Sequence, residues 1–122
     1  MDHNSSEVGF KGIVTDSATR AKQSITFRLT FLDASRLEGS GHDEIGDFSV
    51  AGSYSDTGEI SFIARHANGC CVRRFTGIRD PDASPGTVVG KWMCEDGTNG
   101  DFSGVAVPIA LLSYFPAQAS QF

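Results

Sequence analysis

The chain is 122 residues long, the usual size of one domain, so we expect a single domain over residues 1–122. Hydrophobic residues make up 39% and charged residues 20%, a balance that is ordinary for a globular protein and too apolar for disorder. The net charge is −5 and no basic run is longer than Arg73-Arg74, so we expect neither a nucleic-acid nor a membrane partner, both of which need a concentrated basic surface.

The first residues and the cysteines bear on location and chemistry. Residues 1–7 are polar and lack the regions of a signal peptide, so we expect a flexible N-terminus and a cytoplasmic protein. Cys70 and Cys71 are adjacent and would face opposite sides of a strand, so free thiols are expected, Cys94 included. No Cys or His spacing is typical of a metal site, and we expect no metal and no cofactor.

Segments that alternate apolar and polar residues follow one another along the chain, separated by turn signals about every ten residues. Only residues 17–23 have a trace of helical periodicity. The C-terminal residues 109–122 are expected to add a closing strand or to form a tail. The alternation predicts strands at residues 8–14, 24–32, 36–43, 46–54, 60–66, 70–75, 87–95 and 102–106.

The links between these strands favour a meander. Asp56-Thr57-Gly58 and Asn68-Gly69 are hairpin signals, and residues 79–86 form a loop by composition. Short links favour successive strands that pair with each other, and a meander that closes on itself leaves no exposed edge. The sequence therefore predicts an all-β fold, an antiparallel up-and-down meander barrel of about eight strands, whose interior holds side chains or one small ligand.

The hairpin pattern of residues 36–107 also carries a resemblance. It runs from Gly39-Ser40-Gly41 through Gly52-Ser53-Tyr54 to Gly90-Lys91-Trp92 and resembles the calycin group, the lipocalin-like and avidin-like barrels. The only tryptophan is Trp92, so the N-terminal Gly-x-Trp signature of lipocalins is absent. The resemblance implies a barrel that holds a small apolar molecule, and a few related barrels are cofactor-free cyclases or isomerases.

Strand direction assigns most inward polar side chains to one mouth of the barrel. A guanidinium inside a barrel needs an acceptor, so Arg73 either pairs with Asp43 and plugs this mouth or faces a ligand carbonyl or carboxylate. His66 is the acid–base candidate, because the ordinary pKa of histidine lies near neutrality. The polar or reactive residues expected at this mouth are Asp43, His66, Cys71, Arg73 and Cys94, and Tyr54 is expected at the other.

We predict that the barrel binds a small, largely apolar molecule in its lumen, beneath a polar mouth of Asp43, His66 and Arg73. The alternative is a cofactor-free isomerase or cyclase, in which Arg73 polarises a carbonyl, His66 moves a proton and Asp43 completes the catalytic set. A third interpretation is a non-catalytic interaction module with a packed interior. The side chains expected to contact a ligand are Phe48, Tyr54, Phe62, Cys71, Phe75, Trp92 and Phe102.

The outer face of the barrel bears on assembly. Closed barrels of this type often pair through their outer faces, which leaves a homodimer open. Here the outward apolar residues are scattered, as at Ile63, Val89 and Val105, and single exposed apolar residues need no partner to explain them.

Overall fold

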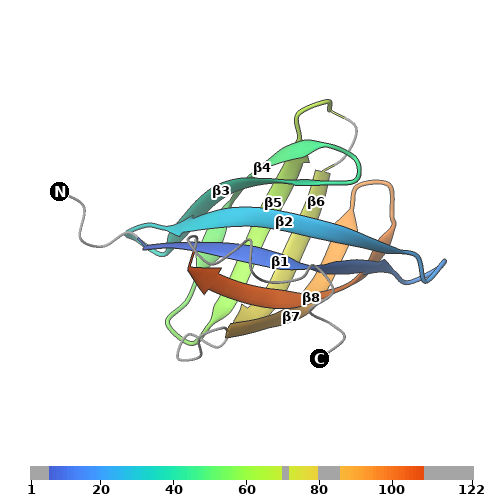
Figure 1. Ribbon diagram of the computed structural model, residues 1–122. Coiled ribbons are helices and arrows are strands. Elements are labelled where there is room, and N and C mark those ends of the chain that lie inside the picture. Colours follow the sequence, from blue (N-terminus) through green and yellow to red (C-terminus); the bar gives the residue numbers. More distant parts are fainter. Residues whose placement is uncertain (1–5, 70–71, 80–85, 109–122) are drawn as a thin grey trace.

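The computed structural model describes residues 6–69, 72–79 and 86–108. These residues form a closed antiparallel barrel in which each strand pairs with its neighbours in sequence, which confirms the predicted meander (Figure 1). Within the described ranges no helix is long and apolar enough to cross a membrane. The strands are β1 (Ser6–Asp16), β2 (Lys22–Phe31), β3 (Arg36–Asp43), β4 (Asp47–Tyr54), β5 (Glu59–His66), β6 (Val72–Arg79), β7 (Gly86–Cys94) and β8 (Asn99–Pro108).

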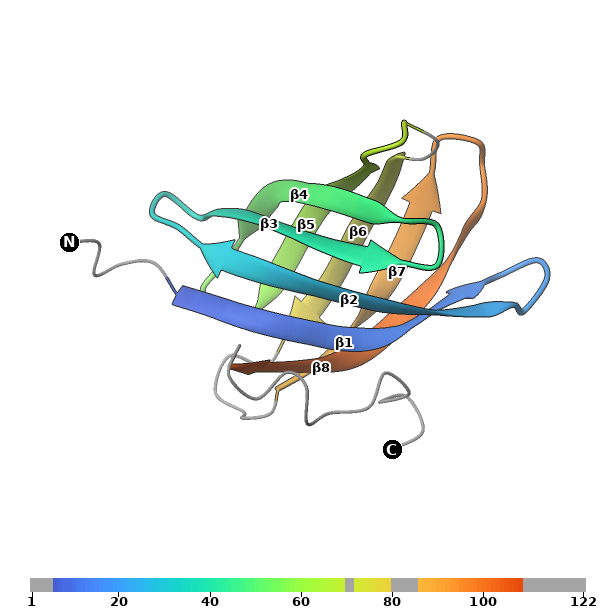
Figure 2. The same ribbon diagram turned by 45° about the horizontal axis from the view of Figure 1, so that its top comes forward.

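The barrel closes through β1, which lies between β2 and β8 (Figure 2). Phe10 of β1 is opposite Phe27 on one side and Ala106 on the other. β1 begins at Ser6, two residues before the expected start, because the ladder with β2 continues to the pair Ser6 and Phe31. β8 ends at Pro108, so closure is complete without residues 109–122, which lie outside the described residues together with the expected closing strand or tail.

Two local expectations were wrong. Residues 17–21 form a turn and β2 begins at Lys22, so the helical trace in this segment is not realised. The residue expected to open the loop after β6, Arg79, is instead the last residue of that strand, where it pairs with Val88. In both cases cross-strand pairing overrides the local sequence preference.

The middle of the barrel is filled by phenylalanine rings from the inward faces of the strands. Phe10 stacks on Phe27 with ring centroids 4.6 Å apart, and Phe62 stacks on Phe75 at 4.9 Å. The two stacks meet edge-on where Phe27 contacts Phe62, with centroids 5.5 Å apart. Cavities therefore lie toward the ends of the barrel, beyond these rings.

Two glycines at one end shape the approach of β3 to its neighbours. Gly41 lies so close to β2 that a Cβ placed on it would be 2.3 Å from the Cβ of Phe27, so a larger residue would push the strands apart. Gly46 has a φ of +148°, a conformation that suits glycine, and it ends the turn between β3 and β4. These contacts set the position of Asp43 at the end of β3.

The outer face departs from expectation at Val105. Val89 is 56% exposed, as expected, and Ile63 is half-buried. Val105 faces outward on β8, because it alternates with the inward Phe102 and Ala106 and is not part of the core cluster to which they belong. It is nevertheless only 2% exposed. Its interpretation as an exposed apolar residue was therefore wrong.

Candidate functional site

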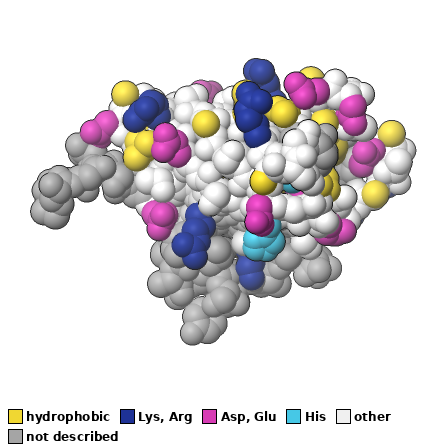
Figure 3. Space-filling model, turned by 90° about the horizontal axis from the view of Figure 1, so that it is seen from above, with side chains coloured by type: hydrophobic (Ala, Val, Ile, Leu, Met, Phe, Trp, Pro, Cys, Tyr) yellow, Lys and Arg dark blue, Asp and Glu magenta, His cyan; other side chains and the backbone are white. Residues whose placement is uncertain are grey.

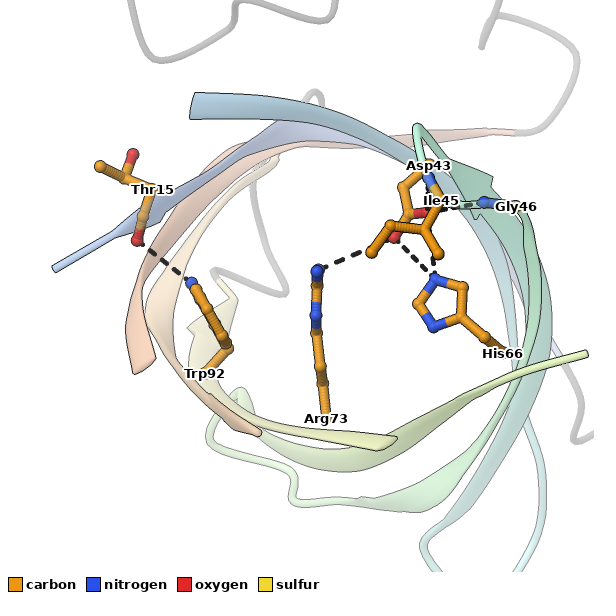
Figure 4. Close-up of polar contacts among 7 residues, drawn as sticks. All are labelled: Thr15, Asp43, Ile45, Gly46, His66, Arg73 and Trp92. Carbon is orange, nitrogen blue, oxygen red and sulfur yellow. Dashed lines mark hydrogen bonds and ion pairs between the residues drawn. The ribbon is translucent and has the colours of Figure 1, made fainter. Parts of the chain in front are cut away.

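Three strands bring Asp43, His66 and Arg73 to one mouth of the barrel, which we call the polar end. Asp43 is the last residue of β3 and His66 the last residue of β5, while Arg73 is the second residue of β6. Because alternate strands run in opposite directions, these positions meet at the same mouth. Figure 4 shows Arg73 reaching into the interior toward Asp43, with Trp92 on one side and His66 on the other.

Asp43 is the centre of this arrangement. Its side chain is 1% exposed, and Oδ1 accepts hydrogen bonds from the backbone N–H groups of Ile45 at 2.8 Å and Gly46 at 3.2 Å. The Nε2 atom of His66 lies 3.0 Å from each carboxylate oxygen. A buried carboxylate needs such donors, and they hold Asp43 as a fixed acceptor inside the barrel mouth.

His66 is held by this contact. With Asp43 as acceptor, Nε2 donates, so the neutral imidazole carries its proton on Nε2 and a lone pair on Nδ1. His66 is 5% exposed, and Nδ1 is buried with no hydrogen-bond partner among the described residues. Phe48 contacts the ring edge-on, with centroids 5.4 Å apart. A carboxylate that orients a histidine and leaves its other nitrogen unpaired is an arrangement that suits a general base.

Arg73 is buried with its hydrogen-bonding capacity only partly used. It is 7% exposed, and its guanidinium carbon lies 5.0 Å from the centre of the Trp92 ring. Nη1 is 3.7 Å from Oδ2 of Asp43, an ion pair that is longer than a hydrogen bond. Neither Nε nor Nη1 has a hydrogen-bond partner in the described part of the chain. The expected ion pair with Asp43 is present, but it leaves Nε and Nη1 without a hydrogen bond to any described residue.

A cavity of about 100 Å³ adjoins Arg73 and Trp92. Its wall also contains Gln23, whose Oε1 atom is buried and has no partner among the described residues. The indole of Trp92 is held in place by a hydrogen bond from Nε1 to the carbonyl oxygen of Thr15, 3.2 Å away. The full lining is Val14, Asp16, Thr19, Ala21, Gln23, Arg73 and Trp92.

The remaining residues expected at the site are distributed through the barrel. Tyr54 lies at the opposite end, as predicted. Cys94 is a free cysteine that packs against the core, and Cys71 lies outside the described residues, as does Cys70. Four expected ligand contacts, Phe48, Phe62, Phe75 and Phe102, are core residues that contact other aromatic rings, and their part in ligand binding stays a prediction.

Sequence reasoning missed two residues at this site, Gln23 and Thr15, and one at the opposite end of the barrel, Arg79. Gln23 and Thr15 lie beside the turn between β1 and β2, where the period-two pattern fades and no motif marks them. Arg79 was assigned to a loop. The alternation Arg73, Phe75, Gly77 along β6 would have placed Arg79 on the inward face had the strand been extended to its true end.

The described residues contain no group of three His, Cys, Asp or Glu side chains that could hold a metal ion. The side chains at the polar end can support proton transfer by His66 and binding of an oxygen acceptor by Arg73. The closed meander is compatible with the calycin resemblance, which stands on the pattern of strands. Comparison with known proteins found no matching family model, no matching curated protein and no matching solved structure.

Proposed function

We propose that this barrel binds a small organic molecule at its polar end, with a carbonyl or carboxylate oxygen of the ligand accepting hydrogen bonds from Arg73. One observation carries the proposal: Nε and Nη1 of the buried Arg73 guanidinium have no hydrogen-bond partner among the described residues, and this side chain lies in the wall of a cavity. Leaving a buried donor unsatisfied costs about 1–3 kcal/mol, and more for a charged group, and a ligand oxygen would recover that cost.

The cavity limits what the ligand can be. An apolar cavity of about 150 Å³ holds benzene, so the space of about 100 Å³ beside Arg73 takes one small functional group with a few carbon atoms. Val14 and Trp92 supply an apolar wall for those carbons, and Gln23 supplies an acceptor for a ligand hydroxyl or amide. We therefore propose that a largely apolar ligand enters through the mouth at the polar end and does not reach the middle of the barrel, which phenylalanine rings fill.

A cofactor-independent isomerase or cyclase is the second candidate. The observation that favours it is the contact of Asp43 with Nε2 of His66, which leaves Nδ1 without a hydrogen-bond partner among the described residues. In this reaction Arg73 would polarise a carbonyl and His66 would take a proton from the adjacent carbon. The calycin-like resemblance, the cytoplasmic location and a homodimer remain predictions.

The binding proposal can be tested with propionate, using Trp92 as a built-in reporter. Because it is the only tryptophan, its indole N–H gives a single, assignable NMR signal beside the cavity. We expect sodium propionate to shift this signal saturably and 1-propanol to shift it far less. Arg73→Gln should weaken propionate binding about tenfold or more, since a hydrogen bond to a charged group contributes about 1.5–3 kcal/mol.

Arg74 provides the matched control. It is exposed on the outer face of the same strand, opposite Ile63 and Met93, so Arg74→Gln removes the same charge without reaching the cavity. Arg73→Lys retains the charge and reports on folding. Equal binding by the Arg73→Gln and Arg74→Gln proteins, or equal responses to propionate and 1-propanol, would show that Arg73 does not bind the ligand.

A further inference from the structure

The end of the barrel opposite Asp43, His66 and Arg73 has a second arginine that the proposed function does not use. We call it the opposite end. Phe31 is the last residue of β2, Tyr54 of β4 and Arg79 of β6, so the antiparallel order brings these three side chains to one mouth. They surround a cavity of about 220 Å³, whose lining is Phe31, Tyr54, Ser55, Asp56, Gly58, Ile60 and Arg79.

Arg79 is held at this cavity without an ion pair to any other described residue. Its guanidinium carbon lies 4.9 Å from the centre of the Phe31 ring, and its backbone N–H donates to the carbonyl oxygen of Gly58 at 2.8 Å. Nε is buried and has no hydrogen-bond partner among residues 6–69, 72–79 and 86–108, and no ion pair to Arg79 occurs within those ranges. Burial lowers the pKa of Arg79. The aromatic face of Phe31 attracts the cation but does not accept the Nε proton.

Phe31, Tyr54 and Ile60 form an apolar, fixed part of the cavity wall. Phe31 is 5% exposed and Ile60 is 6% exposed. The Tyr54 ring meets Phe31 edge-on with centroids 4.8 Å apart, and its hydroxyl donates to the carbonyl oxygen of Leu32 at 2.7 Å. An apolar space of about 150 Å³ holds benzene, so 220 Å³ accommodates an aromatic ring together with an attached carboxylate.

The charges at this end favour a monoanion over a dianion. Asp56, on the cavity wall, is an exposed carboxylate that forms no ion pair with Arg79 within the described ranges. The guanidinium of Arg79 is the only cationic group in the described lining, and its planar N–H groups match the two oxygens of one carboxylate, whereas a dianion would leave one negative charge without a cation in that lining.

We propose that the opposite end is a second binding site, for an aryl carboxylate whose carboxylate group pairs with Arg79 and whose ring contacts Phe31 and Ile60. The site is independent of Arg73 and Trp92, which lie at the other mouth.

Sodium benzoate tests this proposal on the full-length, ¹⁵N-labelled chain. The side-chain Nε–H signals of arginine and the indole N–H signal of Trp92 are followed in one NMR titration at constant ionic strength. We expect one arginine Nε–H signal to shift saturably with benzoate, with benzyl alcohol at least tenfold weaker. Arg79→Gln should lose that signal and weaken benzoate binding at least tenfold, whereas Arg74→Gln should bind as the unmodified chain does.

Asp56→Asn is a second test, in which benzoate affinity should change in the opposite direction. The substitution is at an exposed residue, so it does not disturb the interior. Removing its negative charge should tighten benzoate binding severalfold, because the repulsion of the ligand carboxylate is relieved. The proposal is overturned if Arg79→Gln binds benzoate normally, if Asp56→Asn has no effect, or if Arg73→Gln abolishes binding with the Trp92 signal moving in step. The last outcome would assign benzoate to the polar end, so the two sites can fail separately.

Discussion

At the scale of single residues, Asp43 organises the polar end. Its carboxylate receives two backbone N–H groups, contacts His66 through both oxygens and pairs with Arg73. Replacing a buried ion pair with apolar residues is often neutral for stability, whereas removing one partner leaves an uncompensated charge. The arrangement is therefore better explained by what it does to His66 and Arg73 than by a gain in folding free energy.

A proton-exchange assay tests the role of His66. If His66 accepts protons beside Arg73, the chain should accelerate exchange of the α-hydrogens of butanone for deuterium in D₂O, measured by ¹H NMR. His66→Gln should reduce the acceleration about 100-fold or more, within the range that general bases contribute.

The control for this assay is His42→Gln. His42 directly precedes Asp43 on β3, is exposed, and lies opposite Asp47 of β4. We expect this variant to exchange butanone as the unmodified chain does. Acceleration no greater than that by free imidazole at the same concentration would reject a catalytic role for His66 and leave binding as the function.

At the scale of elements, the turn between β1 and β2 adjoins the polar end and depends on Asp16. Its Oδ1 accepts hydrogen bonds from the backbone N–H groups of Thr19 at 3.0 Å and Ala18 at 2.8 Å. These bonds lower the pKa of Asp16 below its ordinary value of 3.8, and the bond from Thr19 has the larger effect. Asp16 and Thr19 also line the cavity beside Arg73, so the turn positions part of the candidate site.

The lowered pKa of Asp16 predicts a pH-dependent effect of Asp16→Asn. A carboxylate with a depressed pKa in the folded state stabilises the fold above its unfolded pKa, and that stabilisation is lost as pH falls through the folded value. Asp16→Asn should therefore lower Tm at pH 7, and the difference from the unmodified chain should shrink once the pH falls below 3.8. Thermal unfolding followed by circular dichroism at several pH values measures this.

Glu38→Gln is the matched control for Asp16, because Glu38 is exposed on β3 and its removal changes the net charge equally. We expect this variant to show no such pH-dependent difference. A Tm difference for Asp16→Asn that stays constant from pH 7 to pH 3 would mean that the hydrogen-bonded charge contributes nothing to the turn.

At the scale of the whole molecule, the barrel has a filled middle and two distinct ends. The phenylalanine rings that contact one another inside it separate the cavity at Arg73 from that at Arg79. On the face shown in Figure 3, Lys and Arg side chains are scattered among Asp and Glu rather than gathered by sign. Arg73 and Arg79, which have buried guanidinium nitrogens, lie inside the two mouths.

The filled middle predicts a large stability loss for Phe75→Ala. Phe75 is 1% exposed, stacks on Phe62 and meets Phe102 edge-on at 5.2 Å. Truncating a buried phenylalanine costs about 3–5 kcal/mol of unfolding free energy, measurable by urea denaturation. Phe75→Leu should lose less, which keeps the comparison measurable if the alanine variant is unfolded.

Ile78→Ala serves as the control on the same strand, since Ile78 is 58% exposed on the outer face. We expect a change within about 0.5 kcal/mol. If the Phe75→Ala protein were as stable as the Ile78→Ala protein, the interior would hold an open lumen rather than packed rings, which would favour a ligand in the middle of the barrel.

Particular residues show how far the sequence could predict this molecule. Asp43, His66 and Arg73 could be assigned to one mouth because strand direction and a period of two suffice to place them. Arg79 could not, because its neighbours Asp80 and Pro81 resemble a loop and nothing local indicates where the ladder with β7 ends. Gln23 was missed because its role depends on Arg73, a residue 50 positions away in the chain.

By itself the sequence determined the antiparallel meander, since alternation and closely spaced turns are local properties that leave each strand to pair with the next. Only the tertiary structure decided what the interior contains. Whether inward rings enclose a ligand or touch one another depends on the stagger of strands around the closed barrel and on the lengths of side chains from opposite walls. The same closure set the separation of 3.7 Å between Arg73 and Asp43. The proposed function depends on this separation, because it leaves Nε and Nη1 of Arg73 without a hydrogen bond to any described residue.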